Sequence, residues 1–279
     1  MSAAAAASKS RDRAEQTAKD SPWVPRLARA GLVTRGLLHV VVGWLAIRVA
    51  SGDQGRRADQ QGALATLVRQ PMGRVLVLAL ALGFLSYAAW RFVEAALDPE
   101  DKGTLKRIGC GLRGLLYVGL FASAMRLVVG GASKGGGGSS KQQDETARVL
   151  EWPFGRWLVM AVGLAVIGIG MWNGWRAVTR KFEKDLKRYE MSGVERTWTT
   201  RLGMFGHIAR MVAYGVAGFF LVRAGVRFEP HKGVGLDASL HELAGRSYGP
   251  WMLGAVGVGL IAFGVYQFAL ARYRQILGD

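Results

Sequence analysis

The chain has 279 residues, of which 50% are apolar and 39 are glycine, and it carries a formal net charge of +17. This composition favours a membrane protein over one or two soluble domains. The 37 lysines and arginines lie mostly between long apolar runs rather than in a basic domain, which argues against nucleic acid as the main partner.

Six apolar segments are long enough to cross a bilayer, which takes about 20 residues at 1.5 Å per residue. They lie near 28–50, 72–97, 105–130, 154–178, 203–226 and 249–271. We therefore expect an all-α polytopic membrane protein with six transmembrane helices. Basic residues concentrate in the N-terminal tail, the second and fourth connections and the C-terminus, which predicts a multi-pass inner-membrane protein with both termini in the cytoplasm.

The first span contains a motif that returns twice at identical spacing. In order, its four members are a glycine, an arginine, a polar ring and a closing arginine: Gly31, Arg35, His39 and Arg48; Gly109, Arg113, Tyr117 and Arg126; Gly206, Arg210, Tyr214 and Arg223. This periodicity predicts three copies of one two-span unit. Because two spans return the chain to its starting side, the three units run parallel around an axis along the membrane normal, and a closed ring is the natural arrangement.

The second span of each unit repeats as well. A glycine begins it, a small residue lies ten positions later and an aromatic ring seventeen positions later: Gly73, Gly83 and Trp90; Gly155, Ala165 and Trp172; Gly249, Gly259 and Tyr266. Small residues let helix backbones approach closely inside a membrane. Gly170 and Gly174 add one GxxxG pair, a weak indication of close packing.

The units and their connections divide the chain as follows: a disordered cytoplasmic tail at 1–26, repeats at 27–98, 99–180 and 203–272, a cytoplasmic linker at 181–202 and a short tail at 273–279. Glycine and serine crowd 130–143, which is typical of a flexible outer loop. Between the spans of unit one, Leu64, Leu67 and Val68 fall on one helical face, which predicts a short helix on the outer membrane surface, with a polar loop as the alternative.

The linker at 181–202 combines apolar and basic residues. Phe182, Leu186 and Tyr189 recur at helical spacing, which predicts that the fourth span continues as an amphipathic helix along the inner surface. Its basic residues would form a lipid-facing surface that attracts anionic headgroups: Lys181, Lys184, Lys187 and Arg188. A solvated loop that follows the positive-inside rule would explain the same charges.

The arginines inside the spans are the strongest candidates for a site. A charge at the bilayer centre costs at least about 2.5–3.5 kcal/mol, so Arg35, Arg113 and Arg210 should face protein, water or a headgroup. Together with the ring four residues after each, they form a candidate site for an anion or an acidic lipid: His39, Tyr117 and Tyr214. The alternative for these arginines is a role in packing, or snorkelling of the side chain to the headgroups. Snorkelling is the role that we expect for Arg48, Arg126 and Arg223.

The repeated motifs resemble those of a bacterial, largely actinobacterial membrane-protein family known as domain of unknown function 1206. The resemblance rests on the G-x3-R-x3-[HY]-x8-R first helix, the P-x-G entrance and the aromatic end of the second helix, and it covers Leu27 to about Leu270. Unit three departs from it, because Met211 replaces the glycine after the arginine and the proline is displaced. The resemblance implies a fold and no established chemistry.

Signatures of catalysis are absent from the sequence. The histidines have no metal-ligand spacing, Cys110 has no evident base, and no cofactor motif is present. Glu94 could pair with Arg91 three residues before it, serve a repeat arginine, or face headgroups. We therefore expect a non-enzymatic structural module that interacts with the bilayer, with anionic headgroups or with protein partners. The alternative is a carrier or channel for a small anion through a pseudo-threefold arginine-lined site.

Overall fold

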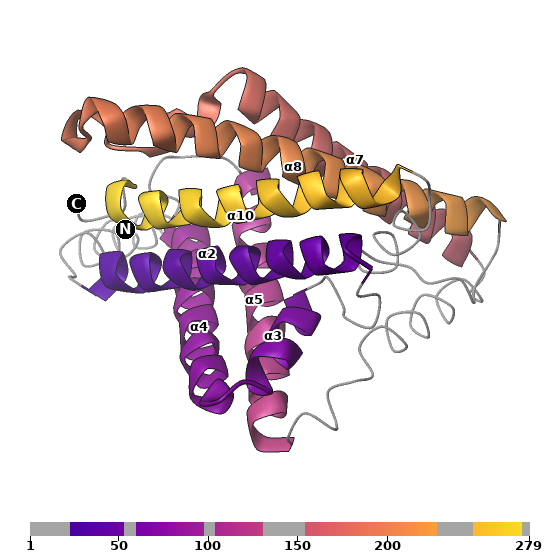
Figure 1. Cartoon of the computed structure of the whole chain (residues 1–279), viewed down its shortest axis with the longest axis horizontal. Helices are drawn as coiled ribbons and strands as arrows, with labels where there is room; N and C mark the ends of the chain where they lie inside the picture. The colour runs from indigo at the N-terminus through magenta and orange to yellow at the C-terminus, as the bar shows by residue number, and fades with distance from the viewer. Residues whose placement is uncertain (1–22, 53–59, 98–103, 131–153, 228–247, 275–279) are drawn as a thin grey trace, which may run out of the picture.

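The computed structural model describes residues 23–52, 60–97, 104–130, 154–227 and 248–274 (Figure 1). Apart from Gly130, the predicted outer loop at 130–143 lies outside the described residues, as do most of both tails. Six long helices dominate: α2 (Trp23–Ala50), α4 (Gly73–Leu97), α5 (Thr104–Gly130), α7 (Gly155–Val178), α8 (Gly193–Arg227) and α10 (Gly249–Tyr273). Each contains a stretch long and apolar enough to cross a bilayer, so the all-α multi-pass architecture is confirmed.

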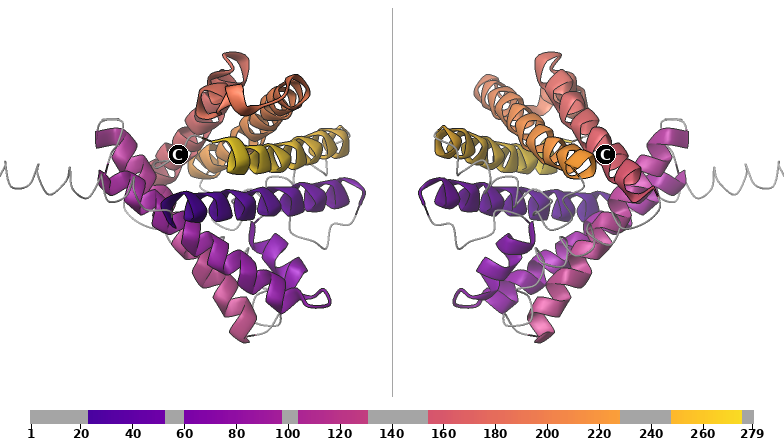
Figure 2. Two further views of the ribbon diagram at one scale, coloured as in Figure 1. Left: turned by 90° about the vertical axis from the view of Figure 1, so that its left-hand side faces the viewer. Right: turned by 90° about the vertical axis from the view of Figure 1, so that its right-hand side faces the viewer.

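The most extensive helix contacts join different units. The first helix of each unit packs against the second helix of the preceding unit, so that α5 pairs with α4, α8 with α7, and α2 with α10. The N-terminal and C-terminal helices therefore lie side by side, as Figure 1 shows. Figure 2 shows the α7/α8 pair on one side of the central α2/α10 pair and the α4/α5 pair on the other.

Contacts between the two helices of one unit connect these pairs into a ring with one break. α2 packs against α4 in unit one, and α8 against α10 in unit three. Between α5 and α7 of unit two, the described residues make no comparable packing. The expected ring is thus continuous from α7 through α8, α10, α2 and α4 to α5, and it is open between α5 and α7.

Paired glycines bring the backbones of two helix pairs together. A Cβ atom on Gly43 of α2 would lie 2.5 Å from the carbonyl oxygen of Gly257 on α10. The equivalent pair joins α8 to α7, where a Cβ on Gly218 would lie 2.6 Å from the carbonyl oxygen of Gly163. Only glycine permits such an approach, which gives lipid-embedded helices their van der Waals contact.

An exchange of volume explains why unit three carries Met211 in place of glycine. In two helix pairs, a glycine on the first helix makes room for a phenylalanine on the second: Gly36 with Phe268, and Gly114 with Phe92. In the α7/α8 pair the bulk changes sides, because Met211 fills the space over Gly174, where a Cβ would lie 2.3 Å from the methionine sulfur. The departure in unit three therefore preserves the packed volume.

This exchange predicts the outcome of a double-mutant cycle. Gly174→Phe should destabilise the protein by about 1–3 kcal/mol because the ring collides with Met211, and Met211→Gly should destabilise it by leaving a cavity. The double variant Met211→Gly/Gly174→Phe restores the arrangement of the other two pairs and should recover most of the loss. Thermal unfolding in detergent gives the stability of the wild type, the two single variants and the double variant. Strictly additive changes in stability would contradict the exchange.

The short segment between the spans of unit one forms a helix, but its environment differs from the expected one. α3 (Gln60–Val68) packs against α2, α4 and α5, and the side chain of Leu64 is fully buried there. Leu67 and Val68 also contact the core. The apolar face therefore covers protein rather than the membrane surface. The counterparts in units two and three lie outside the described residues.

The linker after α7 is not the predicted amphipathic helix. α7 ends at Val178, and Arg180 has a φ of 51°, a left-handed conformation that interrupts a helix. Two short 3₁₀ turns follow, η2 (Lys181–Asp185) and η3 (Arg188–Glu190). Phe182 and Leu186 are buried against the bundle instead of facing lipid, because the Phe182 ring fills the space over Gly203 of α8.

The basic residues of this linker accordingly do not share one helix face. Arg188 pairs with Glu183, and Lys187 lies 3.7 Å from a carboxylate oxygen of Glu190. Lys181 lies over the Trp175 ring, and Lys184 is exposed. α8 begins at Gly193, ten residues before the predicted boundary at 203, and Ser192 and Glu195 form its capping box.

Candidate functional site

Two of the repeat arginines converge on one aromatic ring from different helix pairs. Arg35 of α2 lies about 15 Å beyond Pro25 along its helix, close to the middle of the span. Its guanidinium carbon is 5.9 Å from the centroid of the Phe263 ring on α10, and that of Arg210 on α8 is 4.6 Å from the same centroid. Equivalent residues of units one and three thus meet around Phe263.

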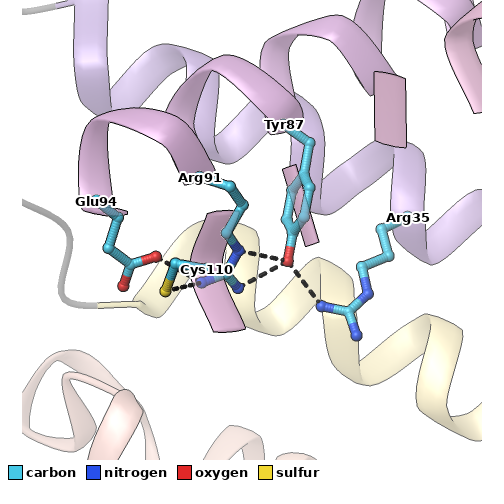
Figure 3. A network of polar contacts seen from close by, with 5 residues as sticks. All are labelled: Arg35, Tyr87, Arg91, Glu94 and Cys110. Atoms are coloured by element: carbon cyan, nitrogen blue, oxygen red, sulfur yellow. Dashed lines mark hydrogen bonds and ion pairs between the residues drawn. The ribbon is translucent and has the colours of Figure 1, made fainter. Parts of the chain in front are cut away.

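Arg35 also belongs to a polar network on α4 (Figure 3). Its Nη1 donates a hydrogen bond to the hydroxyl of Tyr87 at 3.0 Å. The same hydroxyl accepts from Nε and Nη2 of Arg91, at 3.0 and 2.7 Å. Arg91 pairs in turn with Glu94, one of the partners expected for that carboxylate. Two guanidinium groups therefore share one phenol.

The predicted rings line the space beside these arginines. Arg210 donates from Nη2 to the hydroxyl of Tyr214 at 2.9 Å, and the Tyr117 ring lies 4.3 Å from the Tyr87 ring, centroid to centroid. His39 uses Nδ1 to donate to the carbonyl oxygen of Arg35 at 2.7 Å, and its ring packs on Phe263. All three rings are near the arginines, but Nδ1 of His39 bonds a backbone carbonyl oxygen and not an arginine side chain.

The cluster contains more positive charge than its acids balance. Glu94 is the only carboxylate that the described residues place in the network, and it pairs with Arg91. Neither Arg35 nor Arg210 forms an ion pair in the described ranges, and the Nε atom of each is buried without a hydrogen-bond partner. Burying such a donor without an acceptor costs about 1–3 kcal/mol, and more when the group is charged.

Arg113, the third member of the predicted set, occupies a different environment. Its residue is exposed, and within the part of the chain that the structure covers no side chain hydrogen-bonds to it. It lies within electrostatic reach of Arg91, Arg35 and Tyr214. The structure therefore brings all three arginines to one region, with two in the interior and one at the opening between α5 and α7.

A comparison of the three second helices shows why Arg113 has no aromatic partner equivalent to Tyr87 or Phe263. Fourteen residues after the initial glycine of each second helix stand Tyr87, Ile169 and Phe263. Tyr87 and Phe263 receive the arginine of their own unit, whereas Ile169 offers no aromatic face. Sequence reasoning missed this position, although comparing the repeats at that offset would have found it.

Aromatic side chains pack at the end of the cluster that faces the linker between α7 and α8. The Phe182 ring lies 5.3 Å from the His207 ring and 5.5 Å from the Tyr266 ring, and His207 in turn lies 5.3 Å from Phe263. His207 donates from Nδ1 to Oδ1 of Asn173 at 3.1 Å, which joins α8 to α7. This aromatic column lies between the arginines and the rest of the linker.

The three helix pairs carry one equivalent polar position with three different outcomes. Each second helix has a polar residue eighteen positions after its first glycine, and the first helix paired with it has a variable residue directly after its motif glycine: Arg91 with Cys110, Asn173 with His207, and Gln267 with Leu32. The first two pairs are in contact. In the third pair Leu32 has no side-chain donor to offer, and the buried Oε1 of Gln267 has no hydrogen-bond partner among the described residues.

Comparison with known proteins agrees with the repeat architecture. The model of the family described as Domain of Unknown Function (DUF1206) matches the chain three times, over residues 30–98, 108–180 and 205–274. The chain belongs to the DUF1206 family. The three matches coincide with the three units, which confirms the resemblance and the repeats.

Among the relatives of this DUF1206 protein is the Uncharacterized protein YxxB of Bacillus subtilis (strain 168). The two are 30% identical over 260 residues, which cover 91% of this chain and 93% of the relative. No solved structure matches.

The polar position in the DUF1206 repeats generates a pair of opposite predictions. Gln267→Leu removes an unsatisfied buried oxygen and should stabilise the protein by about 1–3 kcal/mol. Asn173→Leu leaves His207 without its acceptor and should destabilise it by a similar amount. Thermal unfolding of both variants is the measurement, and a lower unfolding temperature for Gln267→Leu would contradict the assignment.

Proposed function

We propose that this DUF1206 protein is a non-enzymatic protein of the bacterial inner membrane that binds an anionic, oxygen-rich group between Arg35 and Arg210. The observation that carries the proposal is the convergence of these two buried guanidinium groups on Phe263 with no carboxylate between them in the described residues. Both arginines occupy the same position of the repeat, so the unit itself delivers cations to this place.

The hydrogen-bonding capacity of the arginines supports an oxyanion as the ligand. A guanidinium carries five N–H donors in a planar fork that matches carboxylate and phosphate oxygens. Arg35 donates to Tyr87 and Arg210 to Tyr214, and each also has a buried Nε without an acceptor. An oxyanion would supply the missing acceptors and offset the positive charge in a single step.

The closed inner end favours binding over passage. An anion channel needs an open route through both halves of the bilayer, and a carrier must open each end in turn. The Phe182 and His207 rings fill the end of the cluster toward the linker between α7 and α8. We therefore place anion transport second.

Removal of the cluster charges tests the proposal. Phosphate and sulfate should raise the unfolding temperature of the wild-type protein in neutral detergent, because a ligand that binds the folded state stabilises it. Arg35→Gln and Arg210→Gln should each weaken phosphate binding by about tenfold or more, which corresponds to about 1.4 kcal/mol or more. Isothermal calorimetry on monodisperse protein gives the affinities.

The outer arginines of the same helices provide the matched control. Arg48 lies over the Trp44 ring and Arg223 over the Phe220 ring, away from the cluster. Arg48→Gln and Arg223→Gln remove the same charge and should leave phosphate affinity unchanged. Equal losses of phosphate affinity in the cluster variants and the control variants would show that only net charge matters. That result would refute the site.

The topology in this proposal has its own test. Both termini are proposed to lie in the cytoplasm, because the basic linker between α7 and α8 and the two tails share one side. A reporter enzyme active only in the periplasm should be inactive when fused to either terminus. Activity at either end would reverse the assignment.

A further inference from the structure

The opening between α5 and α7 is a seam that the other two units close. We define the α5/α7 seam by Leu112 and Leu116 of α5 with Ala165 and Ile169 of α7. Ile169 is 53% exposed, whereas its counterparts Tyr87 and Phe263 are at most 1% exposed. A Cβ on Gly109, which begins the stripe to which Arg113 belongs, would meet no atom within 4 Å. Among the described helices, unit two therefore leaves this seam unpacked.

Units one and three close at the equivalent place, but the residues of the α5/α7 seam are too large for the same close packing. At the closest point of unit one, a Cβ on Gly83 would lie 1.8 Å from Oγ1 of Thr34. In unit three, a Cβ on Gly259 would lie 2.3 Å from Cβ of Ala209. Unit two has the larger residues Ala165 and Leu112 at these two positions, so the same approach would produce a collision.

The seam joins an apolar surface to the arginine cluster. Leu112 and Leu116 are 58% and 69% exposed, and their counterparts in the closed seams are buried. Arg113 lies between them in the sequence and follows Gly109 by four residues, which places it on the stripe that faces the opening. A molecule that fills the seam would therefore contact alkyl side chains, and it would contact the cation of Arg113 where the seam meets the arginine cluster.

We propose that the occupant of this seam is a phospholipid with a negatively charged headgroup, whose phosphate binds Arg35, Arg210 and Arg113 and whose acyl chain lies against Leu112, Leu116 and Ile169. This inference rests on the proposed function, to which it adds the ligand class and the direction of entry. The aromatic column at Phe182 closes the inner end, so the ligand enters sideways from the bilayer.

A variant that gives unit two three of the four seam residues of unit three, and keeps Leu116, tests this proposal. Leu112→Ala, Ala165→Gly and Ile169→Phe together reproduce Ala209, Gly259 and Phe263, and should allow α5 and α7 to pack. The matched control is Leu115→Ala, because Leu115 is exposed on the outer face of α5 and its counterpart Leu37 is exposed as well.

Dioctanoyl phosphatidylglycerol, dioctanoyl phosphatidylcholine and inorganic phosphate are titrated against the wild-type protein and each variant. We expect phosphatidylglycerol to bind the wild-type protein at least about tenfold more tightly than either other probe, a difference of about 1.4 kcal/mol. The triple variant should lose that advantage, and Leu115→Ala should keep it.

The outcomes separate this inference from the proposed function. Phosphatidylglycerol and phosphate binding with equal affinity, or lipid binding that survives in the triple variant, would overturn the seam and leave the arginine site as a free-anion site. No binding of any anionic probe, or binding unaffected by Arg35→Gln and Arg210→Gln, would overturn both. A triple variant that fails to fold is replaced by Leu112→Trp, which fills the seam and should weaken lipid binding alone.

Discussion

A guanidinium group in the middle of a membrane-spanning helix must be solvated by something other than lipid tails, and the arrangement of this bundle follows from that requirement. Arg35 and Arg210 donate hydrogen bonds to the hydroxyls of Tyr87 and Tyr214, and both guanidinium groups lie over the Phe263 ring. Tyr87 and Phe263 come from the second helices, so the second helix must pack where the arginine of its own unit points. The charge thereby determines which helices meet within a unit.

Contacts between units respond to a different constraint, which is volume. Without a hydrophobic driving force inside the bilayer, helices associate by fitting closely, and each pair does so by placing a small residue opposite a large one. Gly36 faces Phe268, and Met211 faces Gly174. Because the same space is filled from either side, the repeats can diverge in sequence while the helix pairs keep their spacing.

The sequence alone was sufficient for the six spans, the three units and the arginines, because apolar length and fixed spacing are properties of one segment or of repeats compared at matching positions. Partner choice is a property of two surfaces, so the pairing of α2 with α10 was not predictable from periodicity. The linker differed from its prediction because Arg180 takes a left-handed conformation that its residue type does not signal. The open seam was readable in principle at Ala165, Leu112 and Ile169, where unit two departs from the other units.

That departure follows from the same electrostatic requirement as the cluster. Three closed seams would bury Arg35, Arg113 and Arg210 around one centre that already contains Arg91 and its single acid Glu94. At an effective dielectric constant of about 20, two like charges about 8 Å apart repel by about 2 kcal/mol, and this repulsion adds to the desolvation of each group. Opening one seam leaves Arg113 exposed, so the broken symmetry reduces the charge that the protein must bury.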